Sequence, residues 1–245
     1  MEADEYTRLR QQESVLWWFG LLHRNLFASL DALGLPQSGL RCADLGCGTG
    51  GLIAKLQRRA PAWAIVGLDK SEAALRLARQ YGPHFICGDV QRLPFKAEFF
   101  DVVLAIDVMY HRDVEPGRML TGIFAILKPG GILVLNNPAY EWLRSYHDVF
   151  VHTARRYTAR SVAADLKRAG FTVERCTYWN TILFPVMALK RKLLPGAASR
   201  SDVHDLPGWL NRALAMASLP ETMLLRYGIN LPFGGSVLAI GRKGQ

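Results

Sequence analysis

The sequence predicts an α/β fold in which helices cover both faces of a seven-stranded, mostly parallel sheet. Two observations carry this prediction. Short apolar segments typical of buried strands alternate with amphipathic helical segments along most of the chain. A glycine-rich turn over residues 46–51 joins the first strand to the helix that follows it. The length of 245 residues and the 50% hydrophobic content suit one domain with a substantial core.

The predicted strands follow one another at regular intervals until residue 180. The expected strand segments are 40–46, 63–69, 84–89, 100–107, 130–137, 171–180 and 234–243. The expected helices are 5–33, 52–60, 72–81, 115–127 and 158–170. Ser71 and Thr158 have the side chains that cap helix N-termini, and Gly170 has the freedom to end a helix.

Two segments stand outside this alternation and suggest three units. Residues 1–36 predict an N-terminal helical cover. Residues 37–180 together with 236–245 predict the core that binds a ligand. Residues 181–235 predict a helical insertion with two helical patches, and an insertion of this length usually covers a site.

The bulk composition narrows the class of protein. Four cysteines form neither a C-x-x-C pair nor a zinc-ligand pattern, so we expect no metal and a reduced, cytoplasmic protein. We see neither a signal-peptide core nor an apolar run long enough to span a bilayer. The net charge of +9 is compatible with nucleic acid, anionic lipid or an acidic substrate, but the basic residues are spread along the chain.

Acidic residues end several predicted strands. In parallel sheets, ligands bind beyond the carboxyl ends of the strands. Gly46, Gly48 and Gly51 fit the dinucleotide fingerprint G-x-G-x-x-G, but Asp44 directly before them would repel a pyrophosphate. Asp44 would instead attract a cation such as an ammonium or a sulfonium.

Two further carboxylates indicate what else this ligand contains. Asp69 ends the second strand, where a carboxylate can accept both hydroxyls of a ribose. Asp89 ends the third strand, where it could meet an adenine amino group. A cationic amino acid, a ribose and an adenine together make S-adenosylmethionine.

The segments "DLGCGTG", "VGLDKS", "GDVQRLPF", "FFDVVLAIDVMYH" and "ILKPGGILVL" occur in this order. In them the chain resembles the class I S-adenosylmethionine-dependent methyltransferases. The resemblance implies a Rossmann-like sheet with strand order 3-2-1-4-5-7-6 and an antiparallel strand seven. The segment "LWWFGLLHRNL" is similar to a bacterial branch that carries Trp-Trp-Phe before the core.

The resemblance also implies a set of cofactor contacts. Asp44, Gly46 and Gly48 would line the methionine part, Asp69 would hold the ribose, and Asp89 and Val90 would meet the adenine. Ile106 and Asp107 would lie near the sulfonium. The remaining expected cofactor residues are Leu45, Cys47, Gly50, Lys70 and Trp18. Trp18 belongs to a run of three aromatic residues, 17–19, and an ordinary core contact remains open for it.

Methyl transfer to an O–H or N–H acceptor needs a group that takes up a proton. His111 follows strand four, close to the expected methyl position. His147, His152 and Tyr157 follow strand five and are further catalytic candidates. If 141–152 is helical, Asp148 and His152 share a face at i, i+4. The same residues also fit a cluster that only fixes the loop. We interpret "NNPAY", residues 136–140, as a turn.

The sequence therefore predicts a methyltransferase that acts at O or N of a small-molecule or lipid-like acceptor, of the natural-product or lipid-linked-sugar type. An RNA methyltransferase and a non-catalytic S-adenosylmethionine-binding protein are the alternatives. Nucleic acid is the less favoured partner. Apolar and basic residues in 182–194 suggest peripheral membrane contact, against a simple cover helix. The sequence predicts no oligomeric state.

Overall fold

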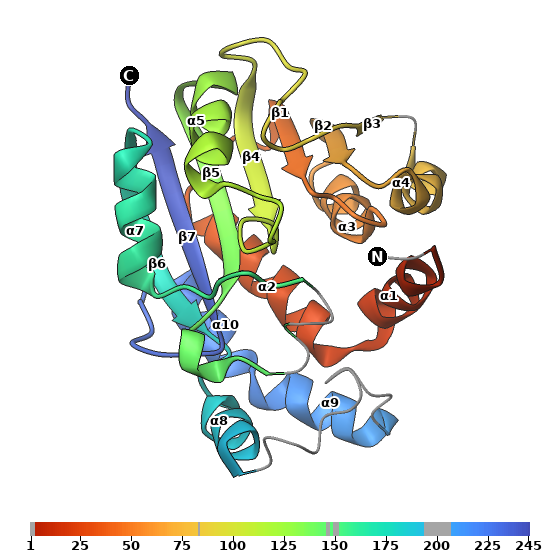
Figure 1. Ribbon diagram of the computed structural model, residues 1–245, viewed down its shortest axis with the longest axis vertical. Coiled ribbons are helices and arrows are strands. Elements are labelled where there is room, and N and C mark those ends of the chain that lie inside the picture. The colour runs from red at the N-terminus through yellow and green to blue at the C-terminus, as the bar shows by residue number, and fades with distance from the viewer. Residues whose placement is uncertain (1–2, 83, 146–147, 149–151, 194–206) are drawn as a thin grey trace.

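A single twisted sheet of seven strands forms the centre of the protein, in the order β3-β2-β1-β4-β5-β7-β6 (Figure 1). The computed structural model describes residues 3–82, 84–145, 148, 152–193 and 207–245. The strands are β1 Ser38–Leu45, β2 Ala62–Asp69, β3 Phe85–Cys87, β4 Phe100–Ile106, β5 Leu127–Pro138, β6 Phe171–Trp179 and β7 Ser236–Lys243. The first five strands pair in parallel, and β7 runs antiparallel to both β5 and β6. The predicted strand order and the antiparallel last strand are both confirmed.

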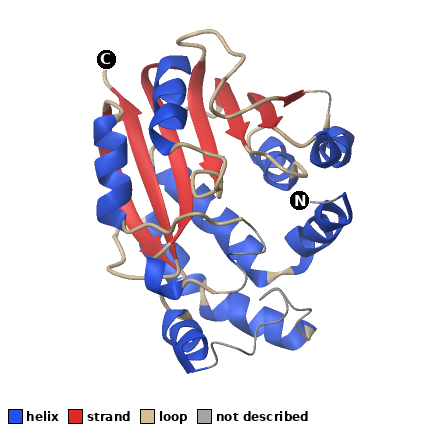
Figure 2. Cartoon of the chain, in the orientation of Figure 1, coloured by secondary structure: helices blue, strands red, loops and turns tan. Residues whose placement is uncertain are grey.

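Helices cover both faces of the sheet, as predicted (Figure 2). One buried apolar cluster joins the sheet to α5 and α7, and a second joins the other face to α2, α3, α4 and α10. These helices are α2 Trp17–Ala32, α3 Gly51–Arg59, α4 Glu72–Ala78, α5 Pro116–Ile126, α7 Ala159–Arg168 and α10 Leu219–Arg226. The 3-10 turn η1, Arg79–Tyr81, follows α4. Since β1 lies between β2 and β4, the chain reverses its winding there, and a ligand site is expected at their carboxyl ends.

Local capping signals place the helix ends where the sequence predicts them. The Ser71 side chain accepts a hydrogen bond from the backbone N–H of Ala74 at 3.3 Å. Thr158 and Ser161 form a reciprocal capping box at the start of α7. Gly170, with a φ of 94°, follows the end of that helix. These caps satisfy backbone groups that the first and last helical turns leave unpaired.

The expected single helix over 5–33 is interrupted at Leu16. The chain forms α1, Ala3–Val15, and then α2, with Leu16 in an extended conformation between them. The N–H of Trp17 donates to Asn211 Oδ1 at 2.7 Å, and Asn211 Nδ2 donates to the carbonyl of Val15 at 2.5 Å. Because a distant side chain satisfies these backbone groups, the break needs neither glycine nor proline.

The insertion contains one helix more than the two patches that the sequence predicts. Its described part holds α8 Phe184–Leu193, α9 Gly208–Ala217 and then α10. Pro220 lies in the first turn of α10. A proline is tolerated there because the N–H it lacks would have no helical partner. In Figure 1, α8 and α9 lie beyond the carboxyl ends of the parallel strands.

Candidate functional site

The glycine turn after β1 has a backbone that only glycine fits. Gly46, Gly48 and Gly50 all have positive φ values, of 76°, 52° and 78°. A Cβ on Gly46 would lie 2.3 Å from Cγ2 of Val108, well inside the contact distance. The N–H groups of Gly46 and Cys47 both donate to the carbonyl of Leu68, at 2.7 and 3.1 Å. The turn is therefore fixed against β2 and the segment after β4.

Asp69 joins the glycine turn to the end of β2. Its Oδ2 accepts from the N–H of Gly48 at 2.9 Å, and its Oδ1 accepts from the N–H of Ser71 at 2.8 Å. Each carboxylate oxygen has a second lone pair for a ligand hydroxyl. The neighbouring Lys70 extends away and pairs with Asp113 at 2.8 Å, and both side chains are largely exposed.

Three carboxylates gather behind the turn. Asp44 is 2% exposed, and burial together with the charges of Asp69 and Glu13 raises its pKa to about 7. Glu13 comes from α1 and accepts a hydrogen bond from Thr49 Oγ1 at 2.6 Å. Burial also raises the pKa of Glu13. A cationic ligand relieves this repulsion, whereas an anion increases it.

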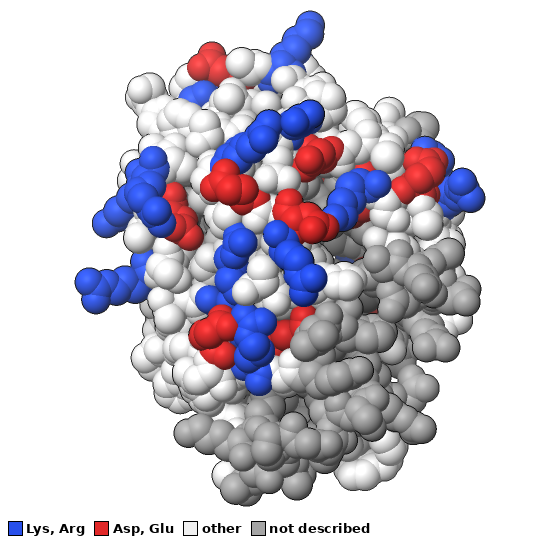
Figure 3. Space-filling view, viewed as in Figure 1, with Lys and Arg blue, Asp and Glu red and all other residues white. Residues whose placement is uncertain are grey.

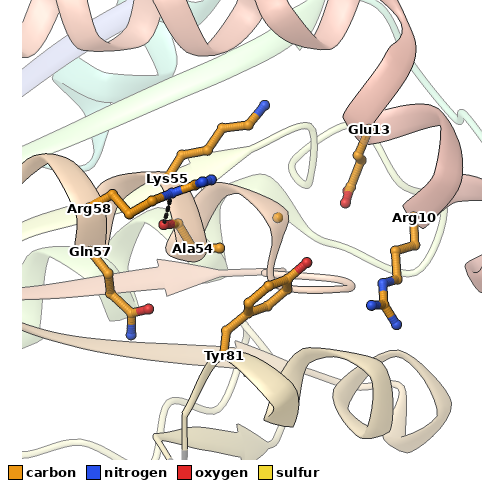
Figure 4. Close-up of a pocket in the computed structure, with 8 residues that line it drawn as sticks. Arg10, Glu13, Ala54, Lys55, Gln57, Arg58 and Tyr81 are labelled. Carbon is orange, nitrogen blue, oxygen red and sulfur yellow. Dashed lines mark hydrogen bonds between the residues drawn. The ribbon is translucent and has the colours of Figure 1, made fainter.

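Glu13 is a site residue that sequence reasoning missed. It lies in a polar helix segment where nothing in the pattern distinguishes it from its neighbours. A cavity of about 540 Å³ opens beside it between α1, α3 and η1. Figure 4 shows Glu13 and Arg10 facing Lys55 and Arg58 across this cavity. The cavity adjoins the glycine turn at Gly51.

Asp89 and Val90, the residues predicted to contact adenine, follow the end of β3. Asp89 is exposed, and its Oδ1 accepts from the N–H of Gln91 at 2.9 Å. Val90 is buried, at 7% exposure. The Gln91 side chain donates to the carbonyl of Asp113 at 2.8 Å and accepts from the N–H of Glu115 at 2.9 Å. This turn is thereby bound to the loop that follows β4.

Asp107 directly follows β4 and has a left-handed conformation, with a φ of 57°. Its Oδ1 accepts from Asn136 Nδ2 at 3.0 Å, and Asn136 Oδ1 accepts from Trp179 Nε1 at 2.7 Å. Since an indole N–H can only donate, Trp179 fixes which way the Asn136 amide points. Burial raises the pKa of Asp107 to about 7.

Trp18 packs into this part of the core. Its ring lies 5.6 Å from that of Trp179 and 5.0 Å from that of Phe19, measured between centroids. This is the core contact that the sequence left open for Trp18. The neighbouring Ile106 is half-buried against the same apolar cluster.

The interpretation of "NNPAY" as a turn is wrong for its first three residues. Asn136, Asn137 and Pro138 belong to β5 and pair with β7. Although β5 lies inside the sheet, it accommodates Pro138 because this is the last residue of the strand. Only Tyr140, with a φ of 54°, departs from extended backbone. Asn136 was missed as a site residue because its contacts with Asp107 and Trp179 join residues far apart in the chain.

His111, which follows β4, and His152, which follows β5, lie on segments that contact each other. The N–H of Arg112 donates to the carbonyl of His152 at 3.1 Å, and His111 forms an isolated bridge with Thr153. The His111 ring stacks on Tyr110 at 4.5 Å. Burial, followed by the charges of Lys70 and His152, lowers the pKa of His111. Its imidazole is therefore neutral at neutral pH.

Within the described residues a helix over 141–152 is not continuous, because residues 144–145 are not helical, while residues 149–151, which would link the helical Asp148 to His152, lie outside them. A short 3-10 helix, η2 Glu141–Leu143, ends at once, and His152 has a φ of 55°. Asp148 is buried and pairs with Arg156 through two contacts, at 2.8 and 3.0 Å. Because its oxygens also accept from the N–H of Ser145, Asp148 stabilises the loop through Arg156.

The other two catalytic candidates are Tyr157 and His147. The hydroxyl of Tyr157 donates to the carbonyl of Met109 at 3.2 Å, and burial raises its pKa to about 12. Both features favour a structural role over proton transfer. His147 lies outside the described residues.

Aromatic side chains cluster where β5 ends and the insertion begins. Tyr140 stacks on Tyr178 at 5.1 Å and on Trp142 at 5.7 Å. Phe184, at the start of α8, lies 5.7 Å from Tyr140 and 5.6 Å from Phe233. Trp142 is 52% and Phe233 41% exposed. This aromatic cluster therefore presents apolar surface to solvent. Across the described ranges, no group of three His, Cys, Asp or Glu side chains is arranged to hold a metal ion.

Comparison with known proteins gives a consistent picture. Residues 43–135 match a family model described as "Methyltransferase domain". The chain is 34% identical over 169 residues to the 2-phytyl-1,4-naphtoquinone methyltransferase of Thermosynechococcus vestitus, covering 63% of this chain and 72% of that protein. It is 29% identical over 152 residues to phthiotriol/phenolphthiotriol dimycocerosates methyltransferase 1 of Mycobacterium ulcerans, covering 60% of this chain. That match spans only about half, 55%, of the mycobacterial protein.

A solved structure has the same fold over the whole chain. It is a chain from the complex between the Trm112 methyltransferase activator of Haloferax volcanii and a methyltransferase, with a TM-score of 0.64 and 21% identity. The match covers 100% of this chain and 98% of that one.

Proposed function

Because the chain belongs to the class I S-adenosylmethionine-dependent methyltransferases, we propose that it methylates an oxygen or nitrogen atom of a small-molecule or lipid-like acceptor. Its cofactor is S-adenosylmethionine, and S-adenosylhomocysteine is the product. The observation that carries the acceptor class is the aromatic cluster beyond β5, which offers a greasy surface next to the carboxyl ends of the strands.

The residues around the glycine turn fit this cofactor. In this proposal Asp44 and Glu13 face the cationic methionine end, and Gly48, where an added Cβ would meet no atom within 4 Å, leaves room for the ligand to approach the backbone. Asp69 accepts the ribose hydroxyls while its other lone pairs retain Gly48 and Ser71. Asp89 and Val90 bind the adenine. Lys70 contributes only through its pair with Asp113.

The transfer itself is an in-line displacement at the methyl carbon. A lone pair of the acceptor forms the new bond to carbon while the carbon–sulfur bond breaks, and the electron pair stays on the neutral thioether. The acceptor proton goes to the imidazole of His111, which follows β4 and whose lowered pKa keeps the ring in its neutral, proton-accepting form. His152 lies beside it and is the second candidate.

Curated relatives support a lipid-like acceptor. The names of two of them refer to a phytyl naphtoquinone and to phthiotriol dimycocerosates. We propose that this chain takes an acceptor of comparable apolar character. The N-terminal cover, residues 1–36, and the insertion, residues 181–235, would shield it from water during transfer.

Charge distribution favours this acceptor over RNA. On the face shown in Figure 3, lysine and arginine side chains are interspersed with aspartate and glutamate. A nucleic-acid site needs a continuous basic surface, because phosphate contacts supply most of its affinity. We therefore keep RNA methylation only as the outcome that an acceptor screen has to exclude.

Location and membrane contact are further parts of the proposal. None of the helices in the described residues is long and apolar enough to cross a membrane. We propose a cytoplasmic enzyme with peripheral membrane contact near residues 182–194. Val186 and Leu189 on α8 are 69% and 59% exposed, which supports such contact, while the side chains of 190–193 lie outside the described set.

Transfer of a labelled methyl group to separate acceptor fractions tests the proposal. The full chain is incubated with methyl-labelled S-adenosylmethionine and either a lipid extract, a pool of small metabolites, or total RNA. We expect label in the lipid or metabolite fraction, abolished by Asp69→Ala and retained in Asp101→Ala. Asp101 is the matched control because it lies at the opposite, amino end of β4.

A second pair of variants tests the proposed base. His111→Gln should lower the transfer rate by about 100-fold while leaving S-adenosylmethionine affinity unchanged. His84→Gln, at an exposed site before β3, should leave both unchanged. Label appearing in RNA alone would replace this proposal by the RNA alternative. No transfer in any fraction, with cofactor binding intact, would favour a non-catalytic binding protein.

A further inference from the structure

The outer faces of α9 and α10 are apolar, the reverse of what a surface helix normally presents. On α9, Trp209 is 72% and Met216 68% exposed. On α10, Met223 is 59% and Tyr227 77% exposed. The residues of each pair are separated by seven or four positions, so they share one helix face. We call this surface, together with Leu219, the α9–α10 face.

The inner faces of the same helices carry buried polar groups beside apolar ones such as Leu225, which is fully buried. Glu221, only 2% exposed, accepts backbone hydrogen bonds from Asn180 at 2.5 Å and Thr181 at 2.7 Å. Thr222 Oγ1 donates to Asn25 Oδ1 at 2.6 Å. Asn211 binds the chain at the α1–α2 break. The unusual feature is the outer face, which on a soluble surface helix is normally polar.

Hydrogen bonds to the core hold both helices with their apolar residues facing outward. Arg175 of β6 donates to the carbonyls of Leu225 at 2.7 Å and Ile229 at 2.8 Å, where α10 ends. Arg24 of α2 donates to the carbonyl of Ala215 in α9 at 3.3 Å. Rotating either helix to hide its apolar residues would break these bonds. The apolar face is therefore preformed.

The charges beside the α9–α10 face indicate what binds to it. In α9 and α10 the exposed charged side chains are Arg212 and Arg226, whereas the one acidic residue, Glu221, is buried. Apolar side chains flanked by arginine complement an anionic lipid surface, into which helices insert their apolar side. Tryptophan and tyrosine, as at positions 209 and 227, favour the headgroup level of a bilayer.

A second copy of this chain fits the face less well. In a two-fold contact the same patch faces itself, so the arginines of one copy would approach those of the other. In Figure 1 the α9 helix also lies beyond the carboxyl ends of β1 and β4, where the cofactor site is located. Docking through this face would turn that end of the molecule toward the bilayer.

We propose that the α9–α10 face is a docking surface for anionic membranes. The inference goes beyond the acceptor proposed above and does not depend on it, since a membrane-bound enzyme could also act on a soluble acceptor. It concerns Trp209, Tyr227, Met216 and Met223 as the inserting side chains, and Arg212 and Arg226 as the contacts to lipid phosphates.

Vesicle co-sedimentation of the full chain tests the proposal directly. Vesicles of phosphatidylcholine alone are compared with vesicles of equal parts phosphatidylcholine and phosphatidylglycerol, at low and high salt. We expect binding to the anionic vesicles only, weakened by salt. The double variant Trp209→Ser/Tyr227→Ser should weaken this binding by at least about tenfold. Because both side chains are exposed, urea unfolding and cofactor affinity should stay as in the parent.

A charge pair supplies the matched control. Arg212→Ser/Arg226→Ser should weaken binding to anionic vesicles, whereas Arg76→Ser/Arg92→Ser, which removes two exposed arginines elsewhere, should not. Equal losses in both pairs would mean that net charge alone drives binding and would overturn the assignment of this face. Absence of vesicle binding by the parent chain would also overturn it.

Sedimentation velocity tests whether the α9–α10 face binds a second copy of the chain instead of a membrane. If the parent chain is a dimer in solution and Trp209→Ser/Tyr227→Ser makes it monomeric, the face is a contact between copies and the proposal fails. We expect the same sedimentation coefficient for the parent and the variant. Failure of the methyl-transfer screen would leave the vesicle result unchanged, so the two proposals can fail separately.

Discussion

The two ends of the site are built in different ways. On the β1–β2 side, the glycine turn, Asp69 and Ser71 are bonded to one another through backbone groups. On the β5 side, Tyr140, Tyr178 and Phe184 come from three separate segments and meet through contacts between their rings. The first arrangement is set by short-range sequence, and the second by how the insertion packs.

This difference explains why the cofactor is easier to identify than the acceptor. The cofactor side recognises a ligand common to a whole family, so its geometry is written into a local motif. The proposed acceptor side combines residues from the loop after β5, the end of β6 and the insertion. Changes in any of these alter its shape without disturbing the fold. Substitutions on the β1–β2 side and substitutions on the β5 side should therefore have different kinds of effect.

Gly46→Ala should have the largest effect. Its Cβ would lie 2.3 Å from Val108 Cγ2, so the turn has to move away from β4 and the cofactor seat is lost. We expect no measurable binding of S-adenosylmethionine in calorimetry. Gly130→Ala is the matched control, with the same φ of 76° but no atom within 4 Å of the added Cβ. It should cost about 1 kcal/mol of stability and leave binding intact. Cofactor binding by Gly46→Ala with parental affinity would refute the geometry of the turn.

The second largest difference is expected in the loss of stability when an ion pair is broken on each side. Asp148 and Arg156, beyond β5, are 1% and 5% exposed. Asp148→Ala leaves a buried guanidinium without its carboxylate, and such a loss costs about 3–5 kcal/mol in urea unfolding. Asp113→Ala breaks the exposed pair with Lys70 and should leave the unfolding midpoint unchanged. Equal effects of the two variants would show that the loop after β5 does not depend on its buried pair.

The sheet order is implied by the resemblance to a family. The sequence predicts the caps at Ser71 and Thr158 and the acidic strand ends because each depends on residues close together in the chain. Glu13, Asn136 and Asn211 could not be assigned in this way. Glu13 acts only because α1 folds back over the glycine turn, and the break that allows this is held by Asn211 from the insertion. Asn136 acquires its orientation from Trp179, on a strand far along the chain. Contacts of this kind leave no local pattern.

The central claim is that Asp44 makes the glycine turn a seat for a cation rather than for a pyrophosphate. Burial raises the pKa of Asp44 to about 7, so the ionised form is the minor species below that pH. The cationic cofactor binds the ionised form, hence its affinity rises as the pH increases through 7. Stability changes the other way. Since the folded pKa lies above the unfolded value, the stabilisation from this group is lost as the pH rises toward 7.

Calorimetric titration with S-adenosylmethionine at pH 6 and pH 7.5 tests this claim most directly. For the parent chain we expect affinity to increase by about eightfold between the two values, the ratio of ionised fractions for a pKa near 7. For Asp44→Asn we expect weaker binding at both pH values and a flatter pH dependence. Parental affinity and an unchanged pH dependence in Asp44→Asn would contradict the account.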